Sequence, residues 1–101
     1  MENYLVEITI HAGEYEKSTK TLIKSNSEVL AINYAIFSES HDPDNLDWSE
    51  PLVIDLHGEF AYRAKATLVP IEDINVLEKY IPSSEANEDD LLLSGNYSEH
   101  H

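Results

Sequence analysis

Hydrophobic and polar residues alternate along four stretches of the chain, and this period of two is typical of strands with one buried face. The stretches are 4–10, 15–23, 52–57 and 60–69. Gly13 and Gly58 interrupt the pattern inside each pair, which predicts one turn near 11–14 and another after 57. The lysines within 15–23 are typical of a strand at the edge of a sheet.

Two other segments have apolar residues at helical spacing. The first predicts a helix over 27–39, because Ser25 and Glu28 have the spacing of a capping box at its start. The second predicts a shorter helix over 72–80, ended by Pro82. The order β-β-α-β-β-α predicts the α+β class, as a four-stranded antiparallel sheet with two helices packed on one face.

The composition changes after the second predicted helix. Residues 82–101 are rich in Ser, Asn, Asp and Glu and contain one apolar island, Leu91–Leu93. Segments of this kind bury too little apolar surface to fold alone. We therefore expect a single α+β domain over 1–81, followed by an acidic, flexible C-terminal tail over 82–101.

Charge is distributed unevenly along the 101 residues. The chain has 20 acidic and 6 basic residues, a net charge of −14. Residues 25–60 contain eight of the acids and no lysine or arginine, and 82–101 contain five more acids and no base. Binding to nucleic acid or to an anionic membrane needs a basic surface, so neither is an expected partner. A basic protein is the partner that this charge favours.

Cysteine is absent, which excludes disulfides, thiolate nucleophiles and cysteine-ligated zinc. The first residues show no basic segment followed by an apolar one, so we expect no signal peptide. No apolar run approaches the roughly 20 residues of a membrane helix. These features predict a cytoplasmic protein, and the lysines of the predicted edge strand favour a monomer over strand pairing.

Acidic side chains are densest in 41–50, where a calcium site is one interpretation because hard cations bind several carboxylate oxygens. The EF-hand spacing is not met, since Leu46 and Val53 occupy the fifth and twelfth loop positions, where oxygen ligands are needed. A solvated acidic loop is the simpler interpretation.

Asp55, His57 and Glu59 alternate along a predicted strand, a pattern compatible with zinc binding or acid–base chemistry. Arg63 and Lys65 are expected on the same sheet face, however, where cross-strand ion pairs explain the acids without chemistry. No nucleophile motif or glycine-rich phosphate loop accompanies them. We therefore expect no enzyme, no cofactor and no metal.

Trp48 lies within the acidic segment and has two interpretations. Either it covers one end of the core, or it anchors an interface, because tryptophan is enriched among residues that dominate binding energy. The interface with a basic partner is the working hypothesis. Its predicted contact residues are Glu39, Asp42, Asp44, Asp47, Trp48, Glu50, Asp55 and Glu59.

These properties predict a small, non-enzymatic acidic protein that docks onto or inhibits a basic protein, such as a nuclease or another nucleic-acid-binding protein. In size and composition the chain resembles the acidic inhibitors of phages and plasmids, namely nucleic-acid mimics, anti-restriction and anti-CRISPR proteins, and also nuclease immunity proteins. That resemblance implies an inhibitor and assigns no residues. The alternative is a housekeeping adaptor or regulatory domain whose acidity serves solubility, with Leu91–Leu93 as a linear motif. A small metal-binding protein is a third hypothesis.

Overall fold

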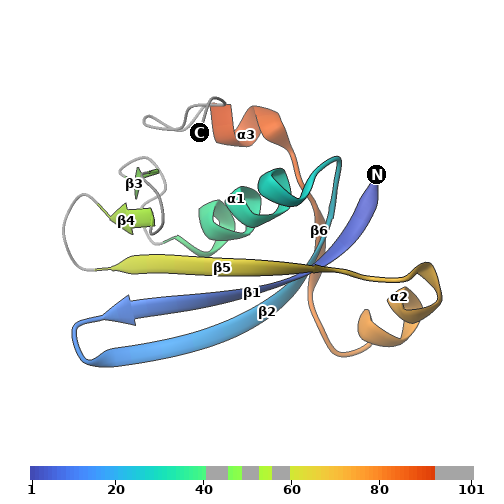
Figure 1. Ribbon diagram of the computed structural model, residues 1–101, viewed down its shortest axis with the longest axis horizontal. Helices are drawn as coiled ribbons and strands as arrows, with labels where there is room; N and C mark the ends of the chain where they lie inside the picture. The colour runs from blue at the N-terminus through green and yellow to red at the C-terminus, as the bar shows by residue number, and fades with distance from the viewer. Residues whose placement is uncertain (41–45, 49–52, 56–59, 93–101) are drawn as a thin grey trace.

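The computed structural model describes residues 1–40, 46–48, 53–55 and 60–92 of the chain. Every predicted strand and helix has a counterpart, and three further short elements are present. In chain order (Figure 1) the elements are β1 (Glu2–Ala12), β2 (Tyr15–Ser25), α1 (Glu28–Glu39), β3 (Leu46–Asp47), β4 (Val53–Asp55), β5 (Ala61–Leu68), α2 (Ile71–Leu77), β6 (Ser83–Glu85) and α3 (Glu88–Leu92).

The described strands form one sheet in the order β3-β4-β5-β1-β2-β6. Neighbouring strands are antiparallel except for β6, which runs parallel to β2. The α+β class is therefore confirmed, but the sheet is mixed and six-stranded rather than antiparallel and four-stranded. The pair is parallel because the chain after α2 runs beside β2 in the same direction as β2. The Leu22 N–H donates to Pro82 O at 2.9 Å, and the Ala86 N–H donates to Lys24 O at 2.8 Å.

β1 and β2 form a long hairpin with a two-residue turn, in which Gly13 adopts the positive φ expected of it, 64°. Even positions of β1 face odd positions of β2, as the alternation predicts. A four-residue turn over 11–14 would place Tyr15 opposite Ile10. The turn is shorter than predicted, so Lys17 lies opposite Ile10 instead.

The start of α1 uses two serine hydroxyls. Ser27 is the N-cap, and its Oγ accepts a hydrogen bond from the Leu30 N–H at 3.1 Å. The helix is where the spacing predicts it, but the predicted capping box is not formed. Ser25 is buried and binds locally, since its Oγ donates to Ser27 O at 2.9 Å and accepts from the Ser27 N–H at 3.2 Å.

Buried residues that the structure describes form two apolar clusters. One lies between α1 and the central strands, and its small helical residues allow the helix to approach the sheet closely. It contains Val6, Ile8, Ile23, Ala31, Ala35 and Ala86. The other lies at the C-terminal end of α1 and contains Ile36, Leu46, Trp48, Val53, Tyr62 and Leu91.

The folded domain continues beyond residue 81, where a flexible tail was predicted. Residues 83–85 add a strand to the sheet, and Ala86 and Leu91 are buried in the two core clusters. The predicted tail therefore includes β6 and α3, which pack onto the domain. Residues 93–101 lie outside the described residues.

α2 differs from the other helices because none of its residues is buried. Figure 1 shows α1 and α3 above the strands, whereas α2 lies apart from both helices at the right, beyond the end of β5. The packing of two helices on one face is thus made by α1 and α3 instead of by α1 and α2.

Candidate functional site

The packing of α3 against α1 brings together two acidic segments that are far apart in the sequence. Leu91 of α3 is fully buried and shares a cluster with Ile36 of α1, and the two helices are in contact (Figure 1). Apolar burial of this kind holds a short helix that would not be stable alone. α1, from the acidic segment 25–60, and α3, from the acidic segment 82–101, therefore meet on one side of the sheet.

The side formed by α1 and α3, called here the helical side, contains no basic residue in either helix. Four of its acidic side chains are exposed to solvent: Glu28, Glu39, Glu88 and Asp89. With no lysine or arginine beside them in these helices, their charges add to a negative surface potential.

Trp48 supports this side from within the core. Its side chain is 5% exposed and packs in the cluster of Leu46, Val53 and Leu91. The interpretation of Trp48 as a cover for one end of the core is the one that this burial favours. A side chain buried to this degree does not anchor an interface directly, so its contribution to a surface is to hold β3 and α3 in place.

The other predicted contact residues fall into two groups. Glu39 is exposed at the last residue of α1, whereas Asp47 and Asp55 belong to the antiparallel pair β3–β4, in which Asp47 pairs with Ile54 and Asp55 with Leu46. The strand pairing therefore brings these two aspartates from separate parts of the acidic segment to neighbouring positions. Asp42, Asp44, Glu50 and Glu59 lie outside the described residues.

The opposite sheet face has the reverse charge, a feature that the predicted contact residues leave out. Even positions of β1 are buried beneath α1, so odd positions point to this open sheet face. The register aligns Lys65 and Lys20 on either side of Glu7, and Arg63 and Ser18 on either side of Thr9. The open sheet face thus exposes three bases, Lys20, Arg63 and Lys65, in two adjacent cross-strand rows. These bases can be located from the sequence by strand alternation once the strand register is known.

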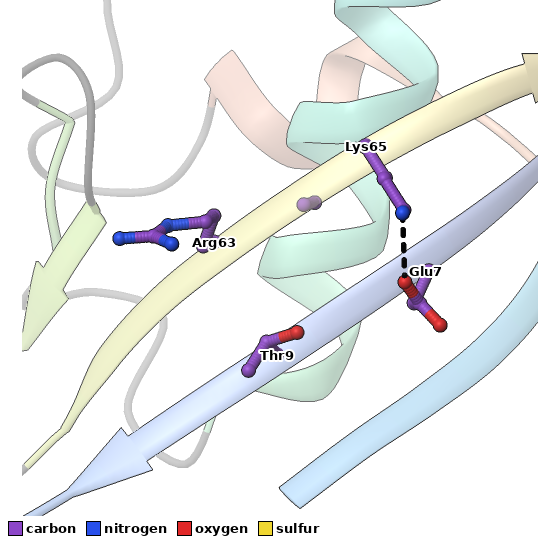
Figure 2. A pocket seen from close by; sticks show the side chains of 5 residues that line it. Glu7, Thr9, Arg63 and Lys65 are labelled. Carbon is purple, nitrogen blue, oxygen red and sulfur yellow. Dashed lines mark ion pairs between the residues drawn. The ribbon is translucent and has the colours of Figure 1, made fainter. Parts of the chain in front are cut away.

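A shallow pocket of about 330 Å³ lies on this face between β1 and β5, lined by Glu7, Thr9, Arg63, Ala64 and Lys65. Figure 2 shows the Lys65 ammonium directed at the Glu7 carboxylate, with Nζ and Oε1 3.4 Å apart. The ion pair is the kind of cross-strand contact expected for Lys65, and no carboxylate among the described residues pairs with the exposed Arg63 guanidinium.

Of the residues considered for metal or acid–base chemistry, Asp55 is the one that the structure describes, at the end of β4. Glu7 pairs with Lys65, and His11 lies 4.0 Å from Glu16, Nδ1 to Oε2. His57 and Glu59 lie outside the described residues. Among the residues that the structure describes, no group of three or more His, Asp or Glu side chains is close enough to hold a metal ion.

No protein-family model matches the chain, and neither a curated protein nor a solved structure matches it significantly. Among the described helices, none has the length and apolar character needed to cross a membrane. The distribution of charge over the fold is the feature of this chain that bears on its function.

Proposed function

We propose that this chain is a non-enzymatic acidic binding protein that uses its helical side to dock onto a basic protein partner. The partner class is a protein with a basic, nucleic-acid-binding surface in the cytoplasm, and docking there would inhibit the binding of nucleic acid. The observation that carries the proposal is the packing of α3 on α1, which joins two acidic segments on a side whose helices contain no base.

Charge segregation across the sheet supports the same proposal. Lys20, Arg63 and Lys65 are exposed on the open sheet face, away from α1 and α3. Lys17 is the base of β2 that the register puts on the same face as α1, and it lies in the hairpin near the turn. Bases within α1 or α3 would instead neutralise the acids there and weaken attraction to a cationic partner. An uneven charge distribution also orients a protein during diffusional encounter, which raises the association rate and selects against acidic partners.

A capture experiment tests the proposal. The full chain, carrying an affinity tag, is immobilised and exposed to a lysate of its source organism, and bound proteins are released with heparin, a polyanion that competes for nucleic-acid-binding surfaces. The expected result is release of a basic protein whose binding to DNA or RNA is inhibited by the purified chain. Capture of proteins that heparin does not release, or that still bind nucleic acid in the presence of the chain, would contradict the proposal.

Two variants with the same net charge then locate the contact. E28Q/E39Q/E88Q/D89N removes four exposed charges from the helical side, and E2Q/E14Q/D73N/E78Q removes four exposed charges from other elements. The first variant should bind the captured partner at least about tenfold more weakly, whereas the second should change the affinity much less. Equal losses for both variants would show that net charge, and not the helical side, determines binding.

A further inference from the structure

The outer edge of β2 is only partly covered. β6 pairs with Leu22–Lys24 alone, so Tyr15–Thr21 has no strand beside it on that edge within the described residues (Figure 1). A strand edge presents unpaired N–H and C=O groups, which makes it a template for pairing with another strand. Seven consecutive residues are long enough for such a pairing.

The hydrogen bonds to the chain around β6 show which backbone groups face outward. The Leu22 N–H and the Lys24 C=O are used by residues on that side, and backbone groups alternate in direction along a strand. Continuing this alternation toward the turn, the N–H and C=O groups of Glu16, Ser18 and Lys20 point away from β1. These six groups are available for an added strand.

We propose that two copies of this chain pair through the free edge of β2, antiparallel and centred on Ser18. Ser18 is the midpoint of Tyr15–Thr21, so a two-fold axis there uses the whole free segment of both copies. It also places two residues with outward-facing backbone groups directly opposite each other, as a hydrogen-bonded antiparallel pair requires.

The charges of the edge complement themselves in this register. Glu16 of each copy lies opposite Lys20 of the other, which makes two equivalent cross-strand ion pairs on the open sheet face. Centring the pairing on Lys17 would instead place two lysines opposite each other. The hairpin also belongs to the nearly neutral segment 1–24, which has four acids and three bases, so the contact avoids the most acidic parts of the two chains.

Lys17 is one of the edge lysines that disfavour strand pairing in the sequence, but in the proposed register its ammonium has a cross-strand acceptor. Lys17 of one copy lies opposite Thr19 of the other, on the face that also carries Thr21. Thr19 Oγ1 is buried and has no hydrogen-bond partner among the described residues. A buried hydroxyl without a partner is unfavourable, and the facing ammonium is a donor within reach of a cross-strand pair.

The mass of the full chain in solution tests the pairing. Sedimentation equilibrium between micromolar and millimolar concentration should show the 11.5 kDa chain passing to a species of twice that mass. Ser18→Pro removes an outward N–H without removing a bond to β1, and proline is tolerated on an edge strand. The S18P chain should therefore stay monomeric, with circular dichroism confirming that it folds. A wild-type chain that is monomeric at every concentration would overturn the proposal and leave the edge to a strand of another protein.

Charge reversal tests the register with matched variants. E16K puts two ammonium groups on the edge and K20E puts two carboxylates there, so each single variant should dimerise less than the wild type. An equimolar mixture of the two should form a mixed dimer, and the double variant E16K/K20E should dimerise like the wild type. Single variants that self-associate as strongly as the wild type would overturn the register. This test involves no other protein, so its outcome is independent of the proposed function.

Discussion

Trp48 and Leu91 close one end of the core, although neither belongs to a periodic run of apolar residues. Each has a surface interpretation in the sequence, as an interface anchor and as part of a linear motif. The structure buries both, because they belong to the same apolar cluster, together with Ile36 of α1. An isolated apolar residue in an acidic segment carries no information on which way it points. Its burial depends on contacts with residues tens of positions away, which is why the sequence did not decide between the two interpretations.

Leu91 lies in the segment that the sequence predicts to be a flexible tail, yet it is buried. Truncating its side chain should therefore cause a large loss of stability. Leu91→Ala should lower the free energy of unfolding by about 2–5 kcal/mol, because it leaves a cavity beside Ile36. Leu68→Ala is the matched control, since Leu68 is 57% exposed, and it should cost much less. Denaturation with urea measures both. A Leu91→Ala chain as stable as the wild type would mean that α3 is not held by this contact.

At the scale of elements, the long strands and α1 were predictable, because each has a repeated apolar pattern. The same alternation placed Lys65 on the open sheet face, where it forms a cross-strand ion pair with Glu7 of β1. β6 and α3 were not predictable in the same way. β6 exposes all three of its side chains and is held by backbone hydrogen bonds, which leave no side-chain pattern. α3 has five residues, too few to show a helical period.

The two ends of α1 give a prediction that separates stability from binding. Glu28 is in the first turn and Glu39 is the last residue, and both are exposed. A carboxylate is favourable near a helix N-terminus and unfavourable near the C-terminus. Glu39→Gln should therefore raise the free energy of unfolding by about 0.3–1 kcal/mol, and Glu28→Gln should lower it by a similar amount.

Thermal or urea unfolding of the two variants measures these shifts. Both variants should weaken binding to the captured partner, despite their opposite effects on stability. If affinity instead followed stability, gaining with Glu39→Gln and falling with Glu28→Gln, the direct role of these carboxylates in binding would be refuted.

At the scale of the whole molecule, the fold converts an uneven sequence of charges into two sides. The acidic segments were evident in the sequence, but their meeting on the helical side depends on α3, and the bases on the open sheet face depend on the strand register. Of the predicted contact residues, Glu39 lies at the surface of the helical side and Trp48 lies beneath it. Glu88 and Asp89 were missed because they fall in the predicted tail.

The net charge predicts how salt affects folding. With a charge of −14, mutual repulsion among the acids destabilises the compact state, and added salt screens it. The midpoint of thermal unfolding should therefore rise as NaCl is increased from low to moderate concentration at neutral pH. The same titration near pH 4.4, the sequence pI, is the control and should show a smaller rise. A midpoint that does not change with salt at neutral pH would show that the acids are too far apart to repel each other.

Leu91 follows every other member of its core cluster in the sequence, and this affects the order in which the domain is built during translation. β1, β2 and α1 leave the ribosome first, and the β1–β2 hairpin can pair before β5, which pairs with β1 and contacts α1, has emerged. The cluster around Trp48 lacks one wall until α3 has emerged, so a nascent chain that ends before residue 88 exposes apolar surface there. The helical side is therefore completed only when α3 has emerged, because a chain that ends before residue 88 lacks Glu88 and Asp89 as well as Leu91.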